Sequence, residues 1–355
     1  MIDARLLHDG GQTAEEIAGP LVAWLSQARA SLDIALYDVR LPGPIGDAVA
    51  GALRAAAAGG VAVRIAYNAD DGPSRKPIPP PPRTEPTLLE QLGVPLRAIP
   101  GTRDLMHQKF VVRDGAAVWT GSTNWTLDSW TREENVVITV ESEALARAYA
   151  LDFDDLWTRG RVDGSGDFDV APVDVGGVPV RAWFAPGRGP ELSHRIAERI
   201  GAARTRVRIA SPVLTAAPIL AVLNQVLSEG RVDVAGVCDA TQVTQVFEQW
   251  HTNGHSAWKG PLLARILSGL PWTGKVSTPY APGAVHDYMH AKVTVADDVV
   301  FVGSFNLSRS GEENAENVLE IVDAALAERM AGFIDAVRAR YPAVRPPAYA
   351  ASSSP

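Results

Sequence analysis

The sequence predicts an α/β protein of two similar halves, each a mixed β-sheet flanked by helices, related by a pseudo-two-fold axis with a site at the seam. The first observation behind this prediction is a repeat: HQKFVVRDGAAVWTGSTN at 107–124 returns as HAKVTVADDVVFVGSFN at 290–306, about half a chain later. The second is that β-like and helical segments recur in the same order around each copy. The third is size, because 355 residues with 46% apolar composition can bury a large core.

The elements of the first half begin with a β-α-β pattern. Its strands at 32–37 and 61–67 flank an Ala-rich helix at 44–58, so we expect a right-handed crossover between two parallel strands. The Pro-rich stretch 71–86 predicts a stiff loop, with a ligand for a partner's aromatic groove as the less favoured alternative. The other elements expected here are helices at 14–30, 86–92, 125–130 and 142–158, the motif hairpin, and a strand at 135–140.

The second half repeats this order after a joint rich in Gly, Asp and Val at 160–180. We place the two halves at 1–165 and 166–345, and interpret 239–286 as a variable insertion. Residues 346–355, at the end of a tail rich in Pro, Ala and Ser, are predicted to be disordered. The expected elements are helices at 190–203, 216–228 and 323–340, strands at 206–210, 232–237 and 317–322, and the second motif hairpin.

Composition narrows the class of protein. The formal net charge of −8 argues against a long basic surface that wraps nucleic acid, although it permits a local positive pocket. Cys238 is the only cysteine, which excludes an internal disulfide and a cysteine-based zinc site. No apolar run has the length of a membrane helix, and no signal peptide stands at the N-terminus. We expect a cytoplasmic protein, or a secreted one if a signal peptide has been removed.

Each motif copy is expected to form a β-hairpin that gathers polar groups. Side chains at i and i+2 of a strand share a face, so His107 and Lys109 point the same way, whereas Asp114 falls at an odd offset beside the turn and is expected to be structural. The returning strand brings Ser122 and Asn124 back beside the His-Lys pair. The second copy carries the same set at His290, Lys292, Asp297, Ser304 and Asn306.

These groups suit a phosphate. Lysine supplies positive charge, Ser and Asn supply neutral donors, and an imidazole can act as a nucleophile or carry a proton near neutral pH. Two copies facing each other place two imidazoles on opposite sides of one phosphorus, so one can attack while the other protonates the leaving oxygen. No metal or cofactor is expected, because the two lysines and the donors supply the positive field.

The pattern His-x-Lys-x4-Asp followed by Gly-Ser-x-Asn, present twice, resembles the duplicated HKD signature of the phospholipase D superfamily. The second copy is one residue shorter at its turn. The resemblance covers roughly 20–160 and 185–340. It implies a metal-independent phosphodiesterase with a phosphohistidine intermediate and with His107, the N-terminal copy, as nucleophile. It also implies that carboxylates ten residues after each motif asparagine, Glu134 and Glu316, hold the imidazoles.

The remaining roles follow from this interpretation. Lys109, Lys292, Asn124 and Asn306 are expected to hold the phosphoryl oxygens, with further hydrogen bonds from Ser122 and Ser304. Trp125 is the candidate for substrate contact, by base stacking or at a lipid interface, although most of the nine tryptophans are expected in the core. Trp250 and Trp258 are left open. His251 and His255 are expected on the surface or at a pocket rim, and His286 near the pocket mouth.

The sequence leaves the substrate open. A phospholipid diesterase or phosphatidyl transferase is favoured by the single chain with two motifs and by the acidic balance, and it implies peripheral membrane contact. A nuclease is the alternative, because the Gly-Ser-x-Asn-Trp-Thr form resembles nuclease-like members; a small phosphodiester metabolite is another. An inactive binding module is disfavoured by two intact motifs. The duplicated chain needs no partner subunit to complete its site, so we expect a monomer.

Overall fold

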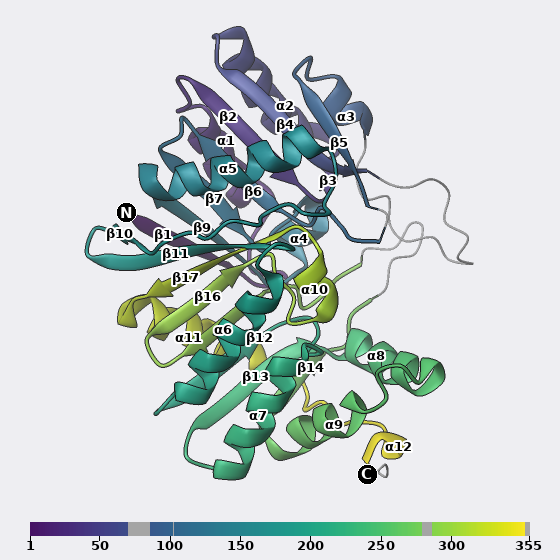
Figure 1. Ribbon diagram of the computed structural model, residues 1–355. Helices are drawn as coiled ribbons and strands as arrows, with labels where there is room; N and C mark the ends of the chain where they lie inside the picture. The colour runs from purple at the N-terminus through teal and green to yellow at the C-terminus, as the bar shows by residue number, and fades with distance from the viewer. Residues whose placement is uncertain (70–85, 102, 279–285, 352–355) are drawn as a thin grey trace.

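The computed structural model describes residues 1–69, 86–101, 103–278 and 286–351, and it shows two large mixed sheets, one in each half (Figure 1). The predicted α/β fold of two similar halves is confirmed. The Pro-rich stretch 71–86 lies outside the described residues, except for Pro86, which begins the short helix α3 (Pro86–Glu90).

The sheet of the first half has seven strands. Its strands in spatial order are β1 (Ile2–Leu7), β9 (Asn135–Glu141), β7 (Ala117–Gly121), β6 (Lys109–Arg113), β2 (Ser31–Leu36), β4 (Ala62–Ala69) and β5 (Leu96–Pro100). The other elements of this half are α1 (Glu15–Leu25), α2 (Gly43–Ala58), α4 (Leu127–Thr131), α5 (Glu143–Arg159) and a parallel pair of short strands, β3 (Val39–Arg40) and β8 (Trp125–Thr126).

The sheet of the second half has eight strands. In spatial order they are β10 (Val173–Val175), β11 (Val178–Ala185), β17 (Glu316–Val322), β16 (Val299–Gly303), β15 (Val293–Ala296), β12 (Arg206–Ala210), β13 (Asp233–Asp239) and β14 (Trp272–Lys275). Its helices are α6 (Gly189–Ala202), α7 (Ala217–Glu229), α8 (Ala240–Asn253), α9 (Lys259–Gly269), α10 (Arg309–Glu313), α11 (Ala324–Arg338) and α12 (Ala348–Ala351).

The two strand orders correspond one to one, apart from the additional edge strand β10. In both halves a parallel pair flanks a crossover helix, β2-α2-β4 and β12-α7-β13, as the sequence predicts. In both halves the motif forms an antiparallel hairpin, β6-β7 and β15-β16, which pairs with the first strand of that crossover. The repeat in sequence is therefore a repeat in topology.

Three apolar clusters make up the core. One lies within the outer layers of each half, and the largest crosses the seam, where Phe110 and Tyr149 of the first half share a buried cluster with Phe184 and Leu319 of the second. Because burial of apolar side chains is the main favourable contribution to folding, this shared cluster fixes how the two halves meet. The geometry of any site at the seam depends on it.

Three regions differ from the sequence-based expectation. Residues 2–7 form a strand that pairs with β9, and the stretch 239–286 supplies α8, α9 and the edge strand β14 rather than only an insertion. The prediction of disorder does not hold for 348–351, because these residues form α12, which packs against α9 and buries Ala350 in the second-half core. Residues 352–355 lie outside the described residues. An amphipathic edge strand and a four-residue helix are too short to give a clear periodic signal.

Candidate active site

The two motif aspartates anchor the hairpins. Asp114 and Asp297 have left-handed backbone conformations, with φ of 55° and 53°, at the hairpin turns. The Asp114 carboxylate accepts hydrogen bonds from backbone N–H groups of residues 29–31, and that of Asp297 accepts from those of 204–206. Burial alone would raise the pKa of both carboxyls, but these bonds, together with one that the Thr205 hydroxyl donates to Asp297, lower the pKa of both, to about 2 for Asp297. Both contacts are structural.

The two motif histidines meet at the seam. His107 and His290 line one cavity of about 250 Å³, together with Asn124 and Asn306. Two isolated β-bridges join the backbones of the two halves next to these histidines: Met106 pairs with Ala315, and Met289 pairs with Glu134. Side chains that are far apart in the sequence therefore converge on one space, as the repeat predicts.

His107 is held by a carboxylate from the other half. Its Nδ1 lies 2.8 Å from Glu316, which is fully buried and also accepts a hydrogen bond from Asn314 at 3.3 Å. Burial raises the pKa of Glu316 to about 8, although the charge of Lys109 and hydrogen bonds from Ser304 and Asn314 act in the opposite direction. This carboxylate is the one that the sequence predicts for the role.

His290 is held differently. Its Nδ1 lies 3.1 Å from the amide oxygen of Asn135 and 3.3 Å from the carboxylate of Glu133. Glu133 accepts hydrogen bonds from the Ser129 hydroxyl at 2.6 Å and from the Asn135 amide at 3.0 Å. Burial, and then the charges of Lys292, Lys109 and His107, lower the pKa of His290 well below its ordinary value. Burial, followed by the charge of Asp128, raises the pKa of Glu133 to about 7.

The prediction that Glu134 holds an imidazole is therefore wrong, and the register of the strands explains why. The Ser122 hydroxyl accepts from the N–H of Val136, whereas the Ser304 hydroxyl accepts from that of Asn317. The first half thus has one more residue between serine and strand, so Asn135 stands where Glu316 stands in the second half. Neighbouring residues of an extended chain point to opposite sides, and Glu134 points away from His290.

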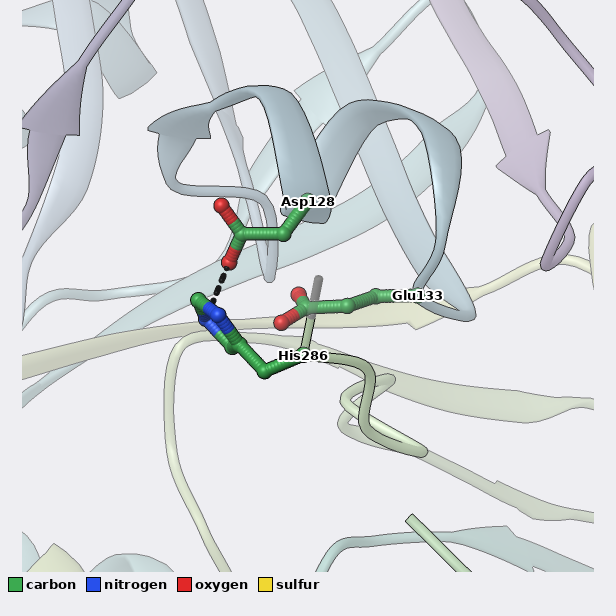
Figure 2. Close-up of side chains that lie close together, drawn as sticks. All are labelled: Asp128, Glu133 and His286. Carbon is green, nitrogen blue, oxygen red and sulfur yellow. Dashed lines mark ion pairs between the residues drawn. The ribbon is translucent and has the colours of Figure 1, made fainter. Parts of the chain in front are cut away.

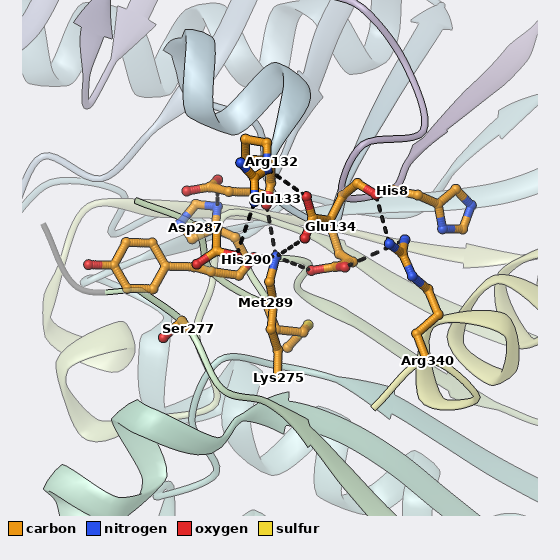
Figure 3. A network of polar contacts seen from close by, with 12 residues as sticks. His8, Arg132, Glu133, Glu134, Lys275, Ser277, Asp287, Met289, His290 and Arg340 are labelled. Atoms are coloured by element: carbon orange, nitrogen blue, oxygen red, sulfur yellow. Dashed lines mark hydrogen bonds and ion pairs between the residues drawn. The ribbon is translucent and has the colours of Figure 1, made fainter. Parts of the chain in front are cut away.

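Glu134 instead joins a buried ionic network around Lys275 (Figure 3). The Lys275 ammonium lies 3.1 Å from Asp9, 3.4 Å from Glu134 and 3.5 Å from Asp287, and the Tyr341 hydroxyl donates to Glu134. Lys275 also donates to the backbone oxygens of residues 132 and 288. The network thereby ties together the two segments that carry His290 and its partners.

The motif lysines are buried and bind their own segments. The Lys109 ammonium donates to the backbone oxygen of His107 at 2.7 Å, and that of Lys292 donates to the backbone oxygen of His290 at 2.6 Å. Burial lowers the pKa of Lys109 to about 7 and that of Lys292 well below its ordinary value. An anion in the cavity would counter this effect, because opposite charge favours the protonated lysine.

Three predicted substrate contacts are corrected. Ser122 and Ser304 are fully buried, and their hydroxyls bond within the protein, Ser122 to Asn135 at 2.7 Å. They support the partners of the imidazoles rather than the substrate. Trp125 lies in the apolar core of the first half and is 4% exposed, so it is not available to stack on a ligand. The burial of Trp125 depends on apolar residues that are distant in the sequence, so the motif alone does not predict it.

The two motif asparagines occupy the positions expected of them. Both line the cavity, and their amide oxygens are buried without a hydrogen-bond partner among the described residues. The indole of Trp130 donates to the backbone oxygen of Asn124 at 2.8 Å, which fixes that side of the cavity.

Sequence reasoning missed the polar groups that surround the imidazoles. Besides Glu133 and Asn135, these include the charged residues Asp38, Arg40 and Asp128. His286 lies at the cavity, as expected. The imidazole of His286 lies 2.7 Å from the Asp128 carboxylate, with Glu133 close by (Figure 2). Arg40 pairs with Asp38 at 2.8 Å and lies 3.8 Å from Asp128. The adjacent acidic pair at 133–134 was the one available signal.

The remaining candidates lie elsewhere. A larger open hollow of about 720 Å³ is lined by residues that include His255 and Trp258, and neither motif histidine lines it. Trp258 is 59% exposed, whereas Trp250 is half-buried against the second-half core. His251 is exposed and its ring contacts that of Tyr349. None of the described helices combines the length and the apolar character that crossing a membrane requires.

Comparisons with known proteins agree with this geometry. The sequence matches the family described as "Cardiolipin synthase, PLD-like domain" over residues 21–157 and 196–337, which together exceed half of the chain and contain both motifs. "Mitochondrial cardiolipin hydrolase" of Xenopus tropicalis is 45% identical over 53 residues, 15% of this chain and 25% of that protein. Its counterpart from Danio rerio is 39% identical over 70 residues, 19% of this chain and 30% of that protein. The chain thus spans less than a third of these relatives.

Two solved structures share the fold. Phosphatidylserine synthase of Haemophilus influenzae superposes with a TM-score of 0.66 at 12% identity, over 96% of this chain and 86% of that one. Polyphosphate kinase of Porphyromonas gingivalis superposes with a TM-score of 0.58 at 12% identity, over 94% and 50%. At such identity these likenesses concern the fold alone. The two matched regions, each carrying one intact motif at a shared seam, establish that the chain belongs to the phospholipase D-like family.

Proposed function

We propose that the protein is a phosphodiesterase that cleaves or transfers a phospholipid-type diester through a phosphohistidine at His107. One observation carries this proposal: His107 and His290, from separate halves, line the same cavity beside the two motif asparagines. A covalent displacement at phosphorus needs a nucleophile on one side and a proton donor on the other, and this arrangement supplies both.

The first step forms a bond between His107 Nε2 and phosphorus and breaks the bond to the leaving oxygen, which takes its proton from His290. In the second step, the oxygen of water or of an acceptor alcohol attacks phosphorus and returns a proton to His290. The P–N bond then breaks and the electron pair returns to His107. Lys109, Lys292 and the two motif asparagines are proposed to stabilise the negative oxygens.

The hydrogen-bond partner at Nδ1 of each imidazole indicates which histidine is the nucleophile and which is the acid. A carboxylate at Nδ1 holds the Nδ1–H tautomer of His107 and makes Nε2 more basic, which favours attack. Nδ1 of His290 instead lies nearest a neutral amide oxygen, that of Asn135 at 3.1 Å, and the Glu133 carboxylate lies farther away at 3.3 Å. That imidazole is stabilised less in its charged form, so it gives up a proton more readily. We infer that His107 is the nucleophile and His290 the acid.

A lipid diester is favoured over nucleic acid for two reasons. Asp38, Asp128 and Glu133 line the cavity beside the imidazoles, and a polyanion whose neighbouring phosphates approach them would be repelled. The names of the cardiolipin hydrolase relatives and of the phosphatidylserine synthase neighbour point in the same direction. Access to a lipid implies peripheral membrane contact, and one chain supplies both imidazoles, so a monomer suffices.

The test compares substrates at fixed enzyme concentration with a chelator present. We expect turnover of phospholipid vesicles, including cardiolipin and phosphatidylcholine, and of a small chromogenic diester, with little cleavage of single-stranded DNA. A phosphoryl group should be trapped on His107 by rapid acid-free quenching and mass spectrometry. Turnover of DNA alone would reject the lipid assignment, and phosphate trapped only on His290 would reverse the assigned roles.

A further inference from the structure

We propose that Asp128, Glu133 and His286 form a binding site for a divalent transition-metal ion such as Zn²⁺ in the wall of the catalytic cavity. The three side chains converge from both halves: Asp128 from α4, Glu133 from the segment after it, and His286 from the segment that leads to the second motif (Figure 2). One ligand atom from each lies within 4.8 Å of the others.

The spacing is close to what a metal requires. Zinc bonds of about 2.0–2.2 Å in a tetrahedron separate ligand atoms by about 3.4 Å, so small side-chain rotations suffice to close the site. Asp128 and His286 are already in direct contact at 2.7 Å, through a hydrogen bond whose proton a metal would replace. Three protein ligands leave a coordination position open to the cavity, as in metal sites that also bind an exogenous ligand.

The surroundings favour an added cation. Asp38, Asp128 and Glu133 are the acidic groups that line this wall, and the neighbouring cations are Arg40, Lys109 and Lys292. The Asp128 and Glu133 carboxylates lie close enough to repel each other, and a cation bound between them would relieve that repulsion. Glu133 is 2% exposed and is held in place by Ser129 and Asn135, so its carboxylate is preorganised.

An independent feature points to a ligand in the same cavity. The amide oxygen of Asn124 is buried, has no hydrogen-bond partner among the described residues, and belongs to a side chain that lines this cavity. An imidazole together with two carboxylates is a ligand set typical of Zn²⁺ or Mn²⁺, whereas Mg²⁺ and Ca²⁺ prefer oxygen ligands alone. We therefore assign the site to a transition metal.

Occupancy is expected to inhibit the enzyme, a consequence that rests on the proposed function, whereas the binding itself does not. The Glu133 carboxylate lies 3.3 Å from His290 Nδ1. A metal that takes this carboxylate removes it from the imidazole and places positive charge beside the proposed acid. The catalytic steps above do not involve the ion.

Isothermal titration with ZnCl₂ tests the binding, using metal-free wild type and the variants D128N and H286Q. We expect one Zn²⁺ per chain in the wild type and at least ten-fold weaker binding in each variant. H194A, which alters an exposed histidine on α6, should match the wild type. H290A should retain binding, at an affinity equal to or above that of the wild type, because it removes the imidazole that competes for the Glu133 carboxylate. Co²⁺ should give visible absorption bands in the wild type that D128N lacks.

Folding is checked by thermal melting without metal. If H286Q does not fold, D128N alone decides the outcome. Wild-type-like affinity in the folded variants would overturn the site, and so would loss of binding in H290A with retention in H286Q, which would place the ion between the motif histidines. Zn²⁺ that binds as expected but leaves turnover unchanged would overturn the inhibition. Absence of turnover on every substrate would count against the proposed function and leave the binding result intact.

Discussion

The two halves of this protein share a strand order and a motif, yet they hold their catalytic imidazoles with different chemistry. In the first half, Nδ1 of His107 meets a buried carboxylate, Glu316, whose neighbour Asn314 is an amide. In the second half, Nδ1 of His290 meets an amide, Asn135, whose neighbour Glu133 is a carboxylate. The carboxylate and the amide have exchanged places across the seam.

This exchange shows how a duplicated site can acquire two roles. An imidazole held at Nδ1 by a carboxylate is a better nucleophile, whereas one held by an amide loses a proton more easily. A fold that repeats itself would otherwise offer two equivalent groups. The one-residue difference in spacing between each motif serine and its following strand is enough to separate them.

Removal of each imidazole gives the largest expected effect. H107A and H290A should each lower kcat by about 10⁴-fold with a poor leaving group. With a nitrophenyl diester, whose leaving group needs no proton, H290A should recover much of that loss and H107A should not. Steady-state assays with both substrates would measure this. Equal recovery in both variants would contradict the assigned roles.

Exchanging the carboxylate and the amide behind the two imidazoles should have the next largest effect on activity. E316Q replaces the carboxylate behind His107 by an amide and should lower kcat by about 10³-fold, because the tautomer is no longer enforced. N135D places a carboxylate behind His290 and should raise the pKa of that imidazole, so the limb of the kcat/KM profile that requires protonated His290 should move to higher pH. Rate profiles between pH 5 and 9 test both, and an unshifted limb in N135D would remove the basis of the comparison.

The neighbouring acids Glu133 and Glu134 should separate activity from stability. E134Q leaves Lys275 with fewer anionic partners, so we expect a loss of about 1–3 kcal/mol in the free energy of unfolding and a change in kcat below about three-fold. E133Q should show the opposite pattern, with kcat lowered about ten-fold. Denaturant titrations and steady-state kinetics on both variants measure the contrast. A larger kcat loss in E134Q than in E133Q would restore the sequence-based assignment.

The hairpin anchors provide the smallest effect. D297N and D114N should each cost about 1–2 kcal/mol of unfolding free energy, with the larger loss at Asp297, which also accepts a hydrogen bond from the Thr205 hydroxyl. Since the pKa of Asp297 is lowered to about 2 on folding, its contribution is present above pH 4 and disappears as the pH falls toward 2. The free energy of unfolding of the wild type and of D297N should be measured at pH 7 and pH 3, and the difference between the two proteins should be smaller at pH 3.

Much of the site was readable from the repeat. The spacing of His, Lys and Asn placed His107, His290, Asn124 and Asn306 around one cavity, because period-two strands and short hairpins leave little freedom. The predictions that were wrong depend on a one-residue shift in strand register or on which side of the chain a side chain points to. Glu134 was one residue from the correct position, and Trp125 follows a motif residue of the cavity while its own ring enters the core.

The sequence by itself determined the duplicated fold, the pairing of the two motifs and the groups that can act on a phosphate. Those features are encoded in local periodicity and in a repeat long enough to be unambiguous. Only the tertiary structure decided which side chain supports which imidazole, that the serines face inward, and that Asp128, Glu133 and His286 meet. The contacts around His107, His290 and His286 join residues from opposite halves, and packing across the seam, which no local pattern records, sets their distances.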